Sequence, residues 1–173
     1  MNINYFFIFI SLCLSAILFL FKPQEADKKL DKDIALFNIL SFSMYELNQN
    51  GLVTFMNGAE GARYKDKYTI FDINYTDNSK EYLANLKAKD GLYRDDILTL
   101  SGDVVYTRQD GFKFETQEAI YDKKSSTATA KGNYVAYMGN NIAYGREIEY
   151  NNALKKLKSK DVFITYHIED KKK

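Results

Sequence analysis

The chain has 173 residues, and 24 Lys and Arg against 23 Asp and Glu give a formal net charge of +1. This balance removes the bulk electrostatic argument for nucleic-acid binding. Hydrophobic residues make up 46% of the chain and Pro occurs once, so wholesale disorder is excluded as well. A single Cys and a single His exclude an internal disulfide, a Cys-based zinc site and His-rich metal cages, and we expect no metal or cofactor.

The first predicted element is an N-terminal membrane helix. Residues 3–21 contain no Asp, Glu, Lys or Arg. As a helix this run spans roughly 28 Å, close to the ~30 Å thickness of a hydrocarbon core. The alternative is a cleaved signal peptide, but no basic region precedes the run, and its small residues Ser11, Ser15 and Ala16 lie in its middle. The sequence therefore predicts an uncleaved transmembrane anchor over residues 1–22.

A charged linker is predicted next, over residues 23–40. Pro23 ends the helix, and four lysines lie within residues 22–32. Under the positive-inside rule these lysines favour a cytoplasmic C-terminal part. Apolar residues return at 34–47, where periodicity does not distinguish a short helix from a first strand. We place the start of the folded domain at residue 41 and its end at residue 170.

This domain is predicted to be all-β. It consists of short runs rich in Tyr, Thr, Val, Ile and Phe, broken by Gly, Asn and Asp. A weak repeat of 28 or 29 residues is marked by Tyr64, Tyr93, Tyr121 and Tyr150. Periods of 20–50 residues indicate a stacked architecture in which each unit packs on the next.

Alternation within the repeats predicts antiparallel strands of about six residues that pack on one face only. Leu98, Leu100 and Val104 share one parity, for example, while Thr99 and Asp103 occupy the other. Turn residues separate these runs at 109–111, 122–126 and 139–141. The predicted fold is therefore a sandwich or jellyroll.

No catalytic constellation is evident, and we do not expect an enzyme. His167 is the only imidazole and is interpreted as a solvated side chain. Acidic residues recur three positions before the repeat tyrosines, at Asp90, Glu118 and Glu147. We interpret them as solvated turn residues rather than a calcium site. The high aromatic content fits either a closed core or an open interior for acyl chains, with Tyr and Lys side chains at its rim for polar headgroups.

These features together resemble a known family. After the apolar N-terminal segment come residues 42–52 (FSMYELNQNGL), and then repeats of the form small-x-Asp/Glu-small-x-Tyr with Leu100-Ser-Gly-Asp-Val104 between them. The pattern resembles the LptC family of bitopic inner-membrane proteins of lipopolysaccharide export, and the repeats resemble related OstA-like periplasmic units. The resemblance covers essentially the whole chain and is best over residues 88–150.

The resemblance implies a twisted, open β-jellyroll of antiparallel strands in the periplasm, preceded by one transmembrane helix in the inner membrane. Members of the family accept lipopolysaccharide from an ABC transporter, beside whose permease subunits they are tethered. They pass the lipid to a soluble periplasmic LptA-like protein of the same fold. The alternative is a membrane-anchored structural or adhesin-like β-sandwich without a lipid cavity.

Two sets of site residues follow. Strand parity predicts that the lipid groove is lined by Leu98, Leu100, Val104, Phe112, Phe114, Tyr134, Ala136, Ile164 and Tyr166. The resemblance implies that the C-terminal edge strand recruits the soluble partner through Phe163, Ile164, Thr165, Tyr166, His167 and Ile168. It also implies that the segment near residues 42–55 faces the transporter.

Overall fold

The computed structural model describes residues 34–49 and 51–168. The predicted anchor over residues 1–22 and the first part of the predicted linker lie outside these residues. Between residues 34 and 168, apart from residue 50, there is no helix that is long and apolar enough to cross a membrane.

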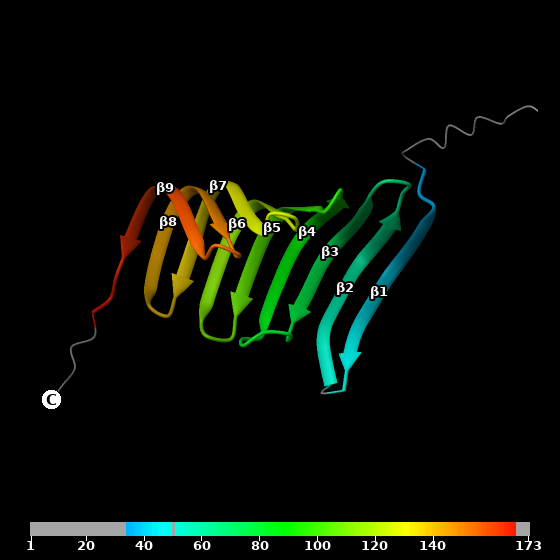
Figure 1. Ribbon diagram of the computed structural model, residues 1–173, viewed down its shortest axis with the longest axis horizontal. Helices are drawn as coiled ribbons and strands as arrows, with labels where there is room; N and C mark the ends of the chain where they lie inside the picture. The colour runs from blue at the N-terminus through cyan, green and yellow to red at the C-terminus, as the bar shows by residue number, and fades with distance from the viewer. Residues whose placement is uncertain (1–33, 50, 169–173) are drawn as a thin grey trace, which may run out of the picture. The chain divides into compact units, whose positions relative to one another are not determined.

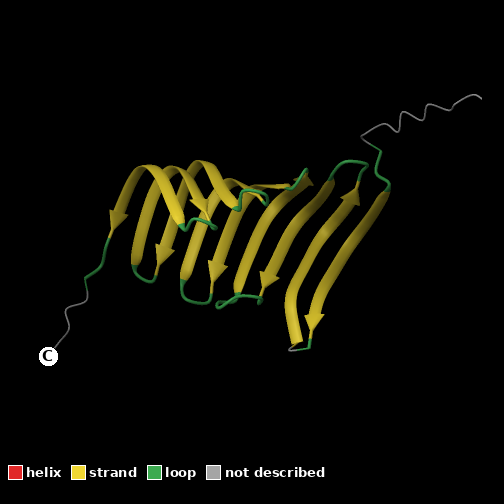
Figure 2. Cartoon of the chain, viewed as in Figure 1, coloured by secondary structure: helices red, strands yellow, loops and turns green. Residues whose placement is uncertain are grey.

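The described chain forms one nine-stranded antiparallel sheet in which the strands lie side by side in the order of the sequence (Figure 1). The strands are β1 (Phe37–Asn48), β2 (Gly51–Arg63), β3 (Tyr68–Asp77), β4 (Ala84–Arg94), β5 (Ile97–Arg108), β6 (Phe112–Asp122), β7 (Thr127–Met138), β8 (Asn141–Asn151) and β9 (Lys156–Thr165). Only strands and loops are present in this part of the chain (Figure 2). The all-β antiparallel prediction is confirmed, and β1 begins at Phe37, within the range predicted as linker.

The strands are longer than the six residues predicted, because most of them continue through an irregularity near their middle. They contain between 10 and 13 residues. In β6 the register with β7 breaks between Thr116 and Ile120. By pairing, Phe114 before this break and Ala119 after it share one face of the sheet, although their numbers differ in parity. The alternation therefore restarts inside a strand, and the sequence gives the impression of two short strands.

These irregularities line up across the sheet and bend it. Register shifts interrupt every ladder from β4–β5 to β8–β9. Non-glycine residues with left-handed backbone conformations lie at the same level, among them Asp72 (φ 51°), Asp103 (φ 50°), Glu147 (φ 51°) and Asp161 (φ 48°). Bulges and left-handed residues increase the local twist and turn a strand. The sheet consequently arches over itself, most clearly at β7–β9 (Figure 1).

The repeat of 28 or 29 residues corresponds to one up-and-down pair of strands. Tyr93, Tyr121 and Tyr150 lie at the ends of β4, β6 and β8, each just before a turn. The acidic residues that precede them were predicted to lie in turns, and this is wrong. Asp90 and Glu147 lie at the irregularities inside β4 and β8, because the strands pass through the bend instead of ending there.

The hydrophobic core lies on the inside of the bend, in the central strands. Its buried cluster consists of Ile73, Ala88, Leu100 and Val104, and Val104 is the most enclosed side chain at 1% exposure. Leu100 precedes the break in β5 and Val104 follows it. The cluster thus holds the two halves of the bent sheet together.

Candidate functional site

The inner face of the bent sheet carries continuous rows of apolar side chains. Residues that are paired directly across an antiparallel ladder share a face. Following the pairs from β3 to β9 gives one inner row: Tyr75, Leu86, Tyr106, Phe114, Ala136, Ala143 and Ile164. Tyr75 and Leu86 pack against the core cluster, which identifies this face as the inner one. The row extends the apolar surface of the core toward the C-terminal edge.

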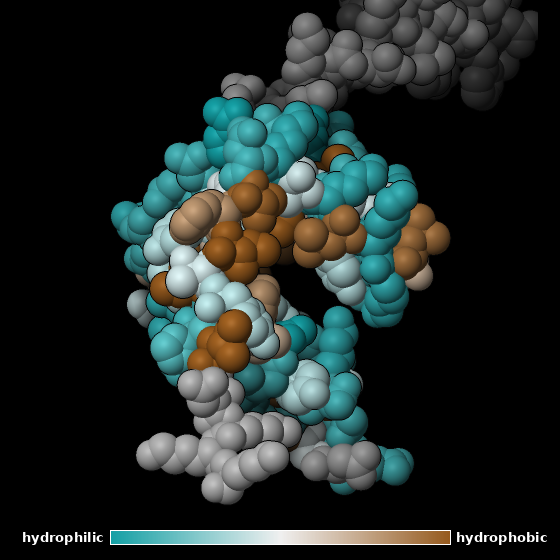
Figure 3. Space-filling view, turned by 90° about the vertical axis from the view of Figure 1, so that its left-hand side faces the viewer, coloured by the Kyte–Doolittle hydropathy of each residue, from teal (hydrophilic) through white to brown (hydrophobic). Residues whose placement is uncertain are grey.

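This inner surface is open to solvent along one side. Seen from the β9 end, the molecule is hollowed, with hydrophobic side chains inside and hydrophilic ones over the outer surface (Figure 3). The hollow has the form of a groove rather than an enclosed cavity. Two smaller hollows of about 430 and 320 Å³ lie along the bend, and both include the polar side chains of Asn57 and Asp72.

The structure places seven of the nine predicted groove residues on the inner face within the sheet. Leu100, Val104 and Tyr134 are buried, and Leu98, Phe112, Phe114 and Ala136 are half-buried. The other two lie at the C-terminal edge. Ile164 belongs to the inner row but is 62% exposed, and Tyr166 follows the last residue of β9 and is 71% exposed.

Sequence reasoning missed the contribution of β3 and β4. Ile73 and Ala88 belong to the buried cluster, and Tyr75 packs against it. The alternation Ile73-Asn-Tyr75-Thr-Asp77 could have revealed β3, but this strand is interrupted after Phe71 by the left-handed Asp72. The resulting change of parity hides the pattern.

Tyr134 connects three strands at the C-terminal end of the groove. Its ring stacks on Phe114 with centroids 5.5 Å apart, and its hydroxyl and that of Ser159 in β9 lie 2.7 Å apart in a hydrogen bond. The side chain passes over Gly145 of β8, where an added Cβ would lie 2.5 Å from the Tyr134 hydroxyl. A glycine is therefore required at position 145 for Tyr134 to reach β9.

The outer face near the bend is held by ion pairs. Lys89 Nζ lies 2.7 Å from an Asp103 carboxylate oxygen, and Gln117 donates a hydrogen bond of 3.2 Å to the other oxygen of Asp103. The hydrogen bond from Lys89 holds the pKa of Asp103 below its ordinary value. Lys160 acts in the same way on Glu147, at 2.5 Å, and lowers its pKa.

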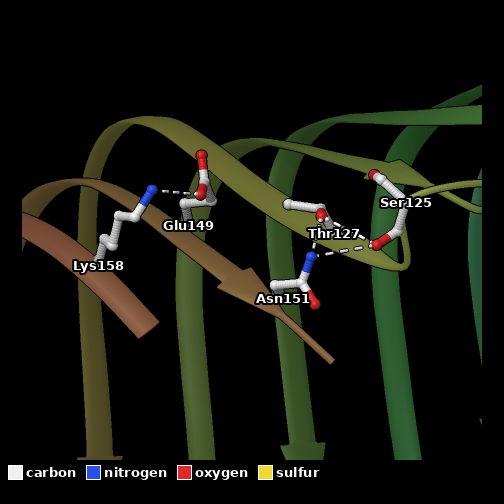
Figure 4. Close-up of polar contacts among 5 residues, drawn as sticks. All are labelled: Ser125, Thr127, Glu149, Asn151 and Lys158. Carbon is white, nitrogen blue, oxygen red and sulfur yellow. Dashed lines mark hydrogen bonds and ion pairs between the residues drawn. The ribbon is translucent and has the colours of Figure 1, made fainter. Parts of the chain in front are cut away.

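Polar contacts also join the last three strands on the outer face, as Figure 4 shows. Asn151 Nδ2 donates to Thr127 Oγ1 at 3.0 Å and to the Ser125 carbonyl at 3.2 Å, while Lys158 lies 3.2 Å from Glu149. These groups are largely solvated, so each contact contributes at most about 1 kcal/mol.

Both edges of the sheet expose apolar side chains. On β9, Phe163 is 67% exposed, and Tyr166 and Ile168 beyond the strand are also exposed. Of the predicted edge residues, Phe163, Ile164 and Thr165 lie in β9, whereas Tyr166, His167 and Ile168 follow it. The His167 backbone N–H donates to Asn141 Oδ1 at 2.8 Å, which keeps this short extension beside β8. Leu40 and Leu47 of β1 are exposed as well.

Comparison with known proteins identifies the family. The sequence pattern of the family described as "Lipopolysaccharide-assembly, LptC-related" matches residues 6–162. The chain belongs to this family. The LptC resemblance found in the sequence is thereby confirmed, and lipopolysaccharide assembly is the process in which the family acts.

The fold has a counterpart among solved structures. The crystal structure of LptH from Pseudomonas aeruginosa, described as the LptA-homologous periplasmic component of the lipopolysaccharide transport device, is similar with a TM-score of 0.50. Identity is 10%, and the similarity covers 80% of this chain and 99% of LptH. This likeness confirms the open, jellyroll-like architecture of the LptC-related chain. Among curated proteins, none matches it in sequence.

Proposed function

We propose that this LptC-related protein carries lipopolysaccharide by holding its acyl chains between the two halves of the bent sheet. It receives the lipid from an ABC transporter of the inner membrane and passes it to a soluble periplasmic LptA-like protein. Residues 1–22 anchor it in the inner membrane by a single span, and the β domain lies in the periplasm. The observation that carries the proposal is the open apolar groove in a chain of this family.

The groove suits transfer rather than storage. Each acyl CH₂ removed from water contributes about 0.8 kcal/mol, so a few half-buried rows are enough to hold a chain. Because the hollow is open along its side, a lipid can enter and leave without unfolding the sheet. Directional transfer then needs comparable affinities at successive sites, with the free energy supplied by ATP hydrolysis in the transporter. The protein itself acts without catalysis and without a cofactor.

The two edges supply the protein contacts. β1 and β9 each pair with one neighbour among the described strands, so each has a free edge at which a further strand can add. Exposed apolar residues on both edges favour such contacts. We assign the β1–β2 end, including residues 42–55, to the transporter, and the β9 end to the soluble partner.

Site-specific photo-crosslinking tests the groove. Phe114 and Glu115 are adjacent in β6, are both half-buried and point to opposite faces. A photoreactive residue at position 114 of the anchored protein should crosslink to lipopolysaccharide, because it faces the groove, and one at position 115 should not. Crosslinking from both positions, or from position 115 alone, would refute the groove assignment and favour the alternative of a β-sandwich without a lipid cavity.

Deletion of residues 166–173 tests the edge assignment. The truncated protein should lose capture of the LptA-like partner in a pull-down, since the exposed Tyr166 and Ile168 are removed. Lipid crosslinking from position 114 should remain, because Phe114 stacks on Tyr134 within the sheet. Equal loss of both readouts would show that the segment does not serve the partner specifically.

A further inference from the structure

A row of tyrosines borders the groove on one side only. By strand pairing Tyr68, Tyr93, Tyr121 and Tyr150 lie in one inner-facing row, with Leu98 and Ala128 between the last three tyrosines and Leu157 beyond Tyr150. Three of these tyrosines are the repeat tyrosines. Arg63 holds the corresponding position in β2, and Tyr68 of β3 holds the position that Leu98 holds in β5. Tyr64 lies in the turn after β2. Leu98 also packs against the core cluster, so the row adjoins the apolar interior.

The turns beside this row are basic. We define the basic rim as residues 63–67, 94–96, 122–124 and 155–156, which contain eight Lys and Arg against four Asp and Glu. We define the opposite rim, at the other ends of the strands, as residues 46–49, 77–81, 108–113 and 138–141. It contains three Lys and Arg against four Asp and Glu. The two rims therefore differ in net charge and face the groove from opposite sides.

The cations of the two rims also differ in their partners. On the opposite rim Arg108 forms two hydrogen bonds with Asp110, at 3.1 and 2.5 Å, and Lys113 pairs with Glu115 at 2.5 Å. On the basic rim Arg94 pairs with Asp66 at 2.6 Å and Lys124 with Asp96 at 3.5 Å.

Arg94 also lies 3.6 Å from Asp95, so three of the four acids of the basic rim are in ion pairs. Five further cations have no ion pair within the described part of the chain: Arg63, Lys65, Lys123, Lys155 and Lys156. Of these, Lys155 donates a hydrogen bond of 2.9 Å to the side chain of Asn152. Arg63 lies in the tyrosine row itself, with its guanidinium carbon 5.6 Å from the centre of the Tyr68 ring.

We propose that the basic rim and the tyrosine row form the subsite for the phosphorylated sugar headgroup of the lipid, while the acyl chains lie on the apolar rows behind them. The subsite rests on the proposed function, because it presupposes that the groove holds acyl chains. Unpaired Lys and Arg side chains attract phosphate, and an arginine fork can bind it through two hydrogen bonds. Tyrosine rings offer an apolar face to a sugar ring and a hydroxyl to its polar groups.

Geometry gives the tyrosine row room for such a ligand. Neighbouring strands lie about 4.8 Å apart, so Tyr93, Tyr121 and Tyr150 are separated by roughly two strand spacings each. The smaller side chains of Leu98 and Ala128 lie between them, and Leu157 follows Tyr150 at the β9 edge. Tyr93 donates its hydroxyl proton to Asp96 at 2.9 Å, so Tyr121 and Tyr150 have the hydroxyls better placed for a ligand.

Charge-matched variants of the full-length protein test the subsite. The first variant combines Arg63→Gln and Lys123→Gln on the basic rim, and the control combines Lys80→Gln and Lys113→Gln on the opposite rim. Affinity is measured for lipid A carrying its phosphates and for the same lipid after enzymatic dephosphorylation. The first variant should lose about fivefold in affinity for the phosphorylated lipid and less than twofold for the dephosphorylated one. The control should bind both lipids as the unchanged protein does.

Three outcomes overturn the subsite. These are an equal loss for both lipids, a larger loss in the control than in the first variant, and full affinity of both variants for the phosphorylated lipid. If the unchanged protein binds neither lipid, the proposed function itself fails, and this result is distinct from the other three. A parallel titration with inorganic phosphate identifies the source of the anion: weak competition supports a lipid headgroup, and displacement at micromolar phosphate overturns it.

Tyrosine substitutions provide a second readout that is independent of charge. Tyr121→Leu removes an inner-facing ring of the row, and Tyr144→Leu removes an outer-facing ring of β8 with comparable exposure, 39% against 45%. Tyr121→Leu should weaken binding of both lipids severalfold through lost stacking, and Tyr144→Leu should leave both affinities unchanged. Equal effects of the two substitutions would contradict the role of the row.

Discussion

The centre of the sheet and its last strand show the same inward alternation but opposite degrees of burial. Leu100 of β5 is 5% exposed, whereas Ile164 of β9 is 62% exposed, although pairing places both on the inner face. Leu100 has strands on both sides and the bent sheet above it, while Ile164 has a neighbouring strand on one side only. Apolar residues at the centre therefore stabilise the fold, and those at the edge remain available for another molecule.

Truncation of these two side chains gives the largest expected contrast. Leu100→Ala should lower the free energy of unfolding by about 3 kcal/mol, because it leaves a cavity in the buried cluster. Ile164→Ala should lower it by less than about 0.5 kcal/mol, since its side chain is largely solvated. Urea unfolding followed by circular dichroism measures both values. Similar losses for the two variants would show that β9 is packed as firmly as the centre.

Gly145→Ala probes the boundary between the two regions. The added methyl group would meet the Tyr134 hydroxyl and displace the ring, so we expect a loss of about 1–3 kcal/mol. Gly132→Ala is a suitable control, because nothing lies within 4 Å of a Cβ at that position. If thermal unfolding shows the two variants to be equally stable, Tyr134 does not depend on a glycine in β8.

Tyr134→Phe should have a smaller and more local effect. Loss of the hydrogen bond to Ser159 should cost about 1 kcal/mol and increase hydrogen exchange in β9, with no change in β3–β5. Tyr144→Phe, on the exposed outer face, serves as the control. Uniform acceleration of exchange over the whole sheet would mean that Tyr134 supports the core rather than the edge.

Lowering the pH should have the smallest effect on the stability of the fold, and it should act through carboxylates on the outer side of the bend. Asp103 and Glu147 have pKa values lowered by hydrogen bonds from Lys89 and Lys160. Such a carboxylate stabilises the fold at pH values above the pKa that it has in the unfolded chain, which is 3.8 for Asp and 4.5 for Glu. This contribution is lost as the pH falls through the lower folded-state pKa.

The midpoint of thermal unfolding should therefore decrease below about pH 4. It should decrease less in Asp103→Asn, which lacks one of these carboxylates. An identical pH profile in this variant would exclude a contribution from Asp103.

The sequence was sufficient to predict the turns, the antiparallel strands and most of the inner residues of β5–β7. In β5 the inner residues Leu100 and Val104 keep the same parity across the bend, so alternation alone places them correctly. The continuity of the strands could not be predicted in the same way. In β3 and β6 the parity changes at the bend, because the inner positions Ile70 and Ile73, or Phe114 and Ala119, differ by an odd step in residue number.

The burial of individual groove residues could not be predicted from alternation either, because it depends on the position of the strand in the sheet. Alternation predicts which face Ile164 occupies, but its exposure follows from its place in the outermost strand. The tyrosine row was visible only as a spacing of 28 or 29 residues. That Tyr64 lies outside the row, with Arg63 in the corresponding position of β2, became apparent only from the strand pairing.

The order of the strands bears on how such a molecule can evolve. Each strand pairs only with the strands that precede and follow it in the chain. A hairpin of one repeat can therefore be gained or lost without rethreading the rest, as in solenoid proteins. Each added repeat would lengthen the groove by two strands, or about 10 Å, and would bring one more tyrosine to the same rim. Under the proposed function, the number of repeats would therefore set the length of the path that a lipid follows along one molecule.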